Sequence, residues 1–267
     1  MPVTKRVPPG ATSIAVARRC DFALASSPDR VMSRLAAVQS CYIPWKGYFD
    51  LLASVDQFVL YDDVQYTKND WRNRNRLKTR SGPRWITIPV RTTGRFGQKI
   101  QEAEIDGSDW APKHLRSLRD AYARAPAFRQ LLPWLEELYA QAGRERLLSR
   151  VNEFFIRAVC DLLGIATRIT SAADYSLPED RIERLVALCR RVGATEYLTG
   201  PAARGYLDEG PFNREGIGVL WMDYSNYPEY SQLWPPFEHR VTILDLLFNV
   251  GPQDAARYFR GGGGAEE

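Results

Sequence analysis

Two adjacent carboxylates, Asp62 and Asp63, are the side chains of this chain that most directly suggest catalysis. They close the segment 57–64, QFVLYDDV, whose apolar start predicts a buried strand. A carboxylate at a strand end can act as a general base, bind an amine or hold Mg²⁺. Because neighbouring side chains of a strand point to opposite faces, at most one of the two faces a ligand unless the chain bends there. We therefore take both as candidate catalytic residues.

Basic side chains follow directly, and they suit an anionic substrate. The stretch from Lys68 to Arg95 is rich in lysine and arginine and contains a single acid, Asp70. Arg72 and Arg74 can each bind a carboxylate or phosphate through two parallel hydrogen bonds. Most charge runs are solvated loops, but asparagine and tryptophan are interleaved with the charges here, which favours a binding surface. The same stretch also suits a non-catalytic RNA- or tRNA-binding module, whose affinity falls steeply with salt.

A second candidate region is QSCYIPWKGYFD, residues 39–50, between a predicted strand and a predicted helix. Pro44 favours a turn, Gly47 lets the backbone approach a ligand, and free N–H groups at a helix start attract anions. The segment is similar to the first loop of nucleotidylyltransferases and pantothenate synthetases, in which a glycine and histidines hold triphosphate. Here Tyr48 stands where a histidine is expected. The topology of this first loop makes an ATP-dependent adenylate-forming ligase or nucleotidylyltransferase, using ATP and Mg²⁺, the main alternative function. Trp45 equally suits simple aromatic packing.

Histidine is scarce, which restricts an imidazole base to His114 and His239. His114 lies in the first turn of a predicted helix, where the helix dipole lowers its pKa and favours the neutral base. We take it as a helper to the carboxylates, although such a residue more often packs or caps. The motifs GxSxG, GxxxxGK[ST] and GxGxxG are absent, which disfavours serine hydrolases, P-loop kinases and NAD enzymes. The cysteines form no CxxC pair, so no metal site is predicted, and we interpret Cys41 as a core residue.

The spacing of apolar residues predicts the elements that position these side chains. Strands at 34–40 and 57–64 flank a helix at 45–54, a unit of the size of a parallel crossover. A hairpin is expected over 74–90 and a further strand over 99–106. Helices and strands then alternate, which predicts an α/β fold: a Rossmann-like, mainly parallel sheet with helices on both faces and an inserted hairpin. Ligands bind beyond the carboxyl ends of such strands, including the one that ends near Thr199 and Gly200.

Longer strings make a comparison with known proteins specific. Gln39 with CYIPWKGYFDLL, then VLYDDVQYTKNDWRNRNRLKT, WITIPV and LDLLFNVG, resembles the WbqC-like family over roughly residues 36–255. The resemblance implies a transferase-like role in surface-polysaccharide or specialised-metabolite biosynthesis, in which an activated acyl or aminoacyl group is joined to an amine such as that of an amino sugar. Ser40 stands where the family usually has proline, a change that bears on substrate choice.

On this hypothesis Asp62 or Asp63, with His114 as helper, accepts the amine proton. The substrate is expected to be a small molecule or carrier-linked, with an aminoacyl-tRNA as one candidate donor, and no cofactor is required unless the ATP-dependent alternative holds. The expected substrate-binding residues are Gln39, Tyr42, Pro44, Trp45, Gly47, Tyr48, Gln65, Lys68, Arg72, Asn73, Arg74, Thr199 and Gly200.

Composition limits the remaining possibilities. With 45% hydrophobic and 25% charged residues the chain is of ordinary globular type. No apolar run approaches the roughly 18 residues of a membrane span, and no signal-peptide core is visible, so we expect a cytoplasmic protein. We expect an irregular N-terminal extension at 1–34, a single WbqC-like α/β domain at 35–260 and a flexible tail at 261–267. Donor, acceptor and oligomeric state are left open.

Overall fold

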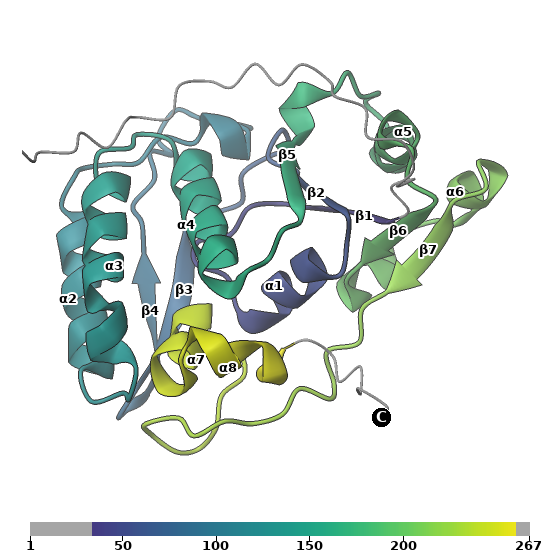
Figure 1. The fold of residues 1–267 in the computed structure, drawn as a ribbon. Coiled ribbons are helices and arrows are strands. Elements are labelled where there is room, and N and C mark those ends of the chain that lie inside the picture. Colours follow the sequence, from purple (N-terminus) through teal and green to yellow (C-terminus); the bar gives the residue numbers. More distant parts are fainter. Residues whose placement is uncertain (1–33, 260–267) are drawn as a thin grey trace, which may run out of the picture. The chain divides into compact units, whose positions relative to one another are not determined.

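The computed structural model describes residues 34–259 and contains a five-stranded parallel sheet (Figure 1). Its strands are β1 (Arg34–Val38), β2 (Gln57–Leu60), β5 (Arg168–Ser171), β6 (Glu196–Thr199) and β7 (Gly218–Trp221). Their order is β5-β2-β1-β6-β7, and every neighbouring pair is parallel. The chain moves outward from β1 to β2 and β5, and then returns to the other side of β1. This doubly wound order confirms the predicted Rossmann-like α/β fold.

Helices cover both faces of the sheet, because alternate strand residues point to opposite sides. Helices α1 (Lys46–Ala53) and α4 (Leu148–Leu163) lie over one face, and α5 (Arg181–Val192) and α6 (Gly210–Arg214) lie over the other (Figure 1). The first face carries the buried residues Ala36, Phe58, Leu60 and Leu198. The second carries Leu35, Val59 and Tyr197. The predicted strand and helix periodicities are both realised in this packing.

The long connection between β2 and β5 carries the inserted hairpin, as predicted. Strands β3 (Arg74–Thr79) and β4 (Gly82–Thr87) form a separate antiparallel sheet, and α2 (Trp110–Tyr122) packs against it. Helix α3 (Phe128–Ala142) leads to α4, and the C-terminal helices α7 (Ile243–Val250) and α8 (Pro252–Ala255) pack against α3 and α4. Short 3₁₀ turns complete the chain: η1 (Ile100–Glu102), η2 (Ala172–Asp174), η3 (Pro201–Gly205) and η4 (Ala256–Tyr258).

The strand expected over residues 99–106 is wrong, because Ile100–Glu102 forms the 3₁₀ turn η1. The backbone N–H of Lys99 donates to the Glu102 carboxylate at 2.9 Å, which closes the turn. Only isolated bridges flank it, such as the one between Val90 and Ile105. The apolar alternation correctly marked residues that are buried, but a turn that buries the same residues satisfies that pattern as well.

The predicted N-terminal extension lies outside the described residues except for Arg34, which begins β1. The predicted tail at 261–267 also lies outside them. Within residues 34–259, no helix combines the length and the apolar character that crossing a membrane requires.

Candidate functional site

The carboxyl ends of β1 and β6 lie side by side where the strand order reverses, which is the usual ligand-binding position in open α/β sheets. Gln39 follows β1, and Gly200 follows Thr199 at the end of β6. The Tyr224 hydroxyl would lie 3.5 Å from a Cβ placed at Gly200, so a larger residue there would touch this ring. The fold thus brings the predicted residues Gln39, Thr199 and Gly200 to one edge of the sheet.

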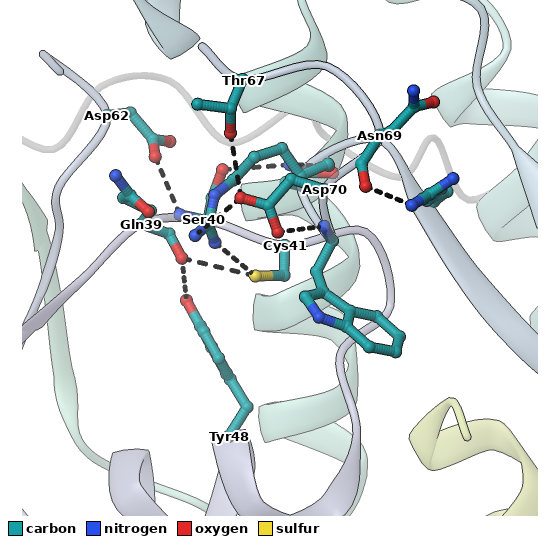
Figure 2. A network of polar contacts seen from close by, with 12 residues as sticks. Gln39, Ser40, Cys41, Tyr48, Asp62, Thr67, Asn69 and Asp70 are labelled. Atoms are coloured by element: carbon teal, nitrogen blue, oxygen red, sulfur yellow. Dashed lines mark hydrogen bonds and ion pairs between the residues drawn. The ribbon is translucent and has the colours of Figure 1, made fainter. Parts of the chain in front are cut away.

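Asp62 fastens the loop that follows β1. Its Oδ1 accepts a hydrogen bond from the backbone N–H of Ser40 at 2.8 Å (Figure 2). The side chain is only 4% exposed. Burial raises the pKa of Asp62 from 3.8 to about 6, against the opposing effects of the Ser40 hydrogen bonds and the Arg72 charge. Asp62 is therefore ionised at neutral pH and is a stronger base than an ordinary aspartate.

Arg72 holds the same loop from another side. Its Nη1 donates to the Sγ of Cys41 at 2.8 Å, and its Nη2 lies 3.7 Å from the Asp70 carboxylate. The Nδ2 of Asn152 donates to the carbonyl oxygen of Arg72 at 2.9 Å and to the Ser40 hydroxyl at 3.0 Å. Figure 2 shows this network of Ser40, Cys41 and Asp70 together with Asp62. The predicted cation Arg72 is thus turned inward, onto the loop after β1.

A cavity of about 310 Å³ opens beside this loop. Its walls are formed by Cys41, Pro44, Trp45, Tyr48, Trp71, Asn75 and Arg240. Aromatic rings with a few polar groups are the usual lining of a small-molecule site, and the volume lies at the lower end of the range for such sites. The cavity brings together three residues of the sequence prediction, namely Pro44, Trp45 and Tyr48. The other four were not predicted to bind a ligand.

Asn75 holds the cavity wall through the backbone of the loop. Ile43 has a φ of 40°, in the left-handed region that β-branched residues rarely adopt. The Nδ2 of Asn75 donates to the carbonyl oxygens of Tyr42 at 3.1 Å and of Ile43 at 2.7 Å, and its Oδ1 accepts from the N–H of Arg76. The inserted hairpin therefore fixes a strained loop of the parallel sheet. The alternation of polar residues in NRNR was the only sequence signal for an inward-facing Asn75.

Gly47 makes room for the indole of Trp45. A Cβ at Gly47 would lie 2.4 Å from Cζ2 of Trp45, which no substitution accommodates without a shift. Trp45 in turn packs edge-on against Tyr224 and Tyr227, with ring centroids 5.2 Å and 5.9 Å apart. The glycine thus shapes the cavity through the position of Trp45.

Lys46 joins the start of α1 to the aromatic loop, residues 224–237. Its Nζ donates to the carbonyl oxygen of Pro228 at 3.1 Å and lies 5.0 Å from the ring centroid of Tyr227 and 5.4 Å from that of Tyr230. Burial lowers the pKa of Lys46 to about 8, against the charges of nearby carboxylates. The aromatic loop is therefore held against α1 by a buried cation that the sequence analysis did not single out.

His114 and Tyr42 lie together in the aromatic core beneath α2. The Nε2 of His114 donates to the carbonyl oxygen of Thr87 at 3.2 Å, so its Nδ1 is the acceptor for the Tyr42 hydroxyl at 2.9 Å. The Tyr42 oxygen then accepts from the Tyr139 hydroxyl at 2.6 Å. Burial lowers the pKa of His114 to about 4, which keeps it neutral. Neither His114 nor Tyr42 lines the cavity, and their predicted site roles stay predictions.

We expect the buried His114 to lower the free energy of unfolding as the pH becomes acidic. Its folded pKa of about 4 lies below its ordinary value of 6.5, so the unfolded chain binds the extra proton and stability falls as pH drops through this window. The difference corresponds to a loss of roughly 3 kcal/mol when the window is fully crossed. Urea unfolding of the wild type and of His114→Gln at neutral pH and near pH 4 checks this. Equal losses in both proteins would contradict it.

Asp63 points away from Asp62 and forms an ion pair with Arg184 of α5. Arg184 also donates to the Tyr61 hydroxyl at 2.6 Å. The opposite directions expected for two successive side chains are therefore observed, and neither Asp62 nor Asp63 lines the cavity. Within residues 34–259 no three His, Cys, Asp or Glu side chains gather as a metal-binding group.

The remaining predicted residues belong to the outer part of the hairpin region. Gln65 and Lys68 are exposed. Asn73 is buried and donates to the carbonyl oxygen of Ile88 at 2.7 Å, which ties the start of the hairpin to the residue that follows β4. Arg74 stacks on the Trp85 ring, with its Cζ 4.2 Å from the centroid. Of these four residues, Arg74 is the one that stacks on an aromatic ring in the described part of the chain.

Comparisons with known proteins agree with the sequence resemblance. The model of the WbqC-like protein family matches residues 39–257. The chain is 51% identical over 231 residues to the uncharacterized protein Rv1507c of Mycobacterium tuberculosis strain H37Rv, a match that covers 86% of this chain and 100% of that protein. No solved structure matches the chain. Since the family model matches most of the chain, including the hairpin and all residues that line the cavity, the chain belongs to the WbqC-like protein family.

Proposed function

We propose that this protein is a transferase that joins an activated acyl or aminoacyl group to an amine, in surface-glycan or specialised-metabolite biosynthesis. One observation carries the proposal. The loop after β1 separates a buried carboxylate of raised pKa from an aromatic cavity, with Asp62 bound to Ser40 and the neighbouring Cys41 lining the cavity. Amide formation from a small acyl group uses a base for the amine proton and a partly apolar pocket for the acyl group, and here the loop after β1 lies between the two.

The chemistry follows from these groups. The acyl group lies between the rings of Trp45 and Trp71, and the exposed guanidinium of Arg240 at the cavity attracts an anionic part of the donor. The amine attacks the acyl carbon, a C–N bond forms, and the bond from that carbon to the carrier breaks. Asp62 does not line the cavity, so the amine proton reaches it through a relay across the loop after β1 and then passes to the departing carrier atom. We expect the reaction in the cytoplasm, where activated donors are made.

Transfer is direct in this proposal, without a thioester on Cys41. Burial raises the pKa of the Cys41 thiol to about 11, although the Arg72 charge opposes the rise. A thiol with so high a pKa is almost fully protonated at neutral pH and is a poor nucleophile. We therefore expect Cys41→Ser to keep turnover within about tenfold of the wild type and no acyl-enzyme to be trapped. Loss of turnover together with a mass increase on Cys41 in the wild type would contradict direct transfer.

The proposed function is tested with donors that are already activated. Acyl thioesters and aminoacyl-tRNAs are incubated with amino-sugar and other amine acceptors, and amide products are detected by mass spectrometry with and without ATP. We expect an amide that forms without ATP. Product that appears only from a free acid with ATP, together with release of AMP, would instead identify an adenylate-forming ligase.

A further inference from the structure

We propose that one face of the β3–β4 hairpin binds the single-stranded 3′ end of an RNA, which makes the donor an aminoacyl-RNA. The proposal rests on the proposed transfer and deepens it by naming the carrier of the activated group. The aromatic and basic side chains of this face, their spacing and their continuity with the cavity support it.

Two tryptophans lie in contact on the surface of the hairpin region. Trp71 is 38% exposed and Trp85 is 41% exposed, and their ring centroids are 4.9 Å apart at an angle of 46°. Large aromatic rings usually lose most of their exposed surface on folding, so two exposed neighbouring indoles indicate a surface that another molecule covers. Indole faces are the usual platforms on which unpaired bases stack.

Arginines of the same hairpin face surround these rings. In the antiparallel register Arg76 lies opposite Trp85, and Arg74 lies two residues before Arg76, so all three share one face. The Cζ of Arg74 lies 4.2 Å from the Trp85 centroid, and that of Arg76 lies 5.6 Å and 5.7 Å from the centroids of Trp71 and Trp85. This combination of ring faces and guanidinium groups suits bases joined by phosphates better than it suits a neutral sugar.

The positive surface is longer than a single nucleotide. From Arg74 to the exposed Arg80 at the hairpin turn the chain covers about 20 Å, and Lys78 between them is buried, with its Nζ donating to the carbonyl oxygen of Pro236. Arg84, on the second strand, pairs with Leu77 and lies on the opposite face, so it does not add to this surface. The acid Glu238 contacts Arg76 at 3.6 Å and offsets only part of this charge. The arginines toward both ends of this face, together with the two adjacent indoles, suit more than one nucleotide and favour an RNA end over a mononucleotide carrier.

The platform is continuous with the cavity of the proposed reaction. Trp71 contacts Trp85 on the outside and also forms part of the cavity wall. Arg240, an exposed residue, lines the same cavity. A terminal base stacked on Trp71 therefore places the group attached to its ribose at the cavity opening.

Binding of a short fluorescent single-stranded RNA ending in CCA tests the proposal without requiring catalysis. We expect Trp85→Ala and Trp71→Ala to weaken binding about 5- to 100-fold, because each removes one stacking surface. Arg74→Gln should reduce the slope of log affinity against log salt by about 0.7. Tyr206→Ala is the matched control, since Tyr206 is an exposed ring stacked on Arg181, with the guanidinium 3.6 Å from its centroid, outside the hairpin. This control should bind like the wild type.

Unchanged RNA binding in both tryptophan variants, or equal weakening in Tyr206→Ala, would overturn the proposal. Adenosine monophosphate that competes as well as the RNA at equal concentration would also overturn it, in favour of a small nucleotide carrier. RNA binding that depends on the tryptophans, without amide formation from any donor, would refute the proposed transfer and leave the RNA site standing. Amide formation from a carrier without a nucleotide, combined with no RNA binding, would refute this inference alone.

Discussion

Replacing Asp62 by asparagine is expected to lower turnover by about 10²- to 10⁴-fold, the usual contribution of a general base. Asparagine keeps an oxygen that accepts the Ser40 N–H but cannot take the amine proton at neutral pH. The wild-type rate should also rise with pH through an acid limb near pH 6, since the pKa of Asp62 is raised to about 6. Steady-state kinetics across pH check both expectations, and the acid limb should disappear in the variant.

Folding of this variant should be preserved, which separates a catalytic loss from a structural one. The folded pKa of about 6 lies above the ordinary 3.8, so the stability that Asp62 contributes is fully present below pH 3.8 and is lost as pH rises through 6. The loss amounts to roughly 3 kcal/mol. Asp62→Asn avoids it and should be no less stable than the wild type near pH 8 in urea unfolding.

Asp63→Asn is the matched control, because Asp63 is the adjacent acid and faces Arg184 instead of the loop after β1. We expect this variant to keep most of its turnover. Normal activity of Asp62→Asn with loss of activity in Asp63→Asn would move the base to Asp63. Normal activity of both would remove the carboxylates from the mechanism.

Asn75→Ala is expected to destabilise the protein by about 2 to 4 kcal/mol, because two buried carbonyl oxygens lose their donor. The Nδ2 of Asn75 reaches the carbonyl oxygens of Tyr42 and Ile43, and the Asn75 side chain is buried. The strained φ of 40° at Ile43 would also lose its support. Thermal or urea unfolding measures the effect.

The cavity should change together with stability in this variant, since Asn75 forms part of its wall. We expect turnover to fall as well, through a higher KM. Asn213→Ala, a change of an exposed asparagine on α6, is the control and should shift stability by less than about 0.5 kcal/mol. Equal effects of the two substitutions would show that the loop after β1 does not depend on Asn75.

Local patterns of apolar and turn residues in the sequence predicted much of the fold. Residues 57–60 and 74–87 form the predicted strand and hairpin because apolar runs and the Ser-Gly-Pro turn act over a few neighbours. The strand predicted around Ile100 was wrong because the apolar residues of this segment are buried in a 3₁₀ turn as well as they would be in a strand. Periodicity reports burial, and burial alone does not select the backbone conformation.

The sequence by itself determined the parallel α/β architecture, the family, and the segments 39–50 and 68–95 that meet at the cavity. These features depend on spacing along the chain. Only the tertiary structure decided that Asp62 binds Ser40 while Asp63 binds Arg184, and that Asn75 and Arg240 share a cavity wall with Trp45. The physical reason is that a side chain beyond a strand end takes its direction from its partners. Here those partners lie in the loop after β1, on α5 and just before α7, all outside the segment 57–64.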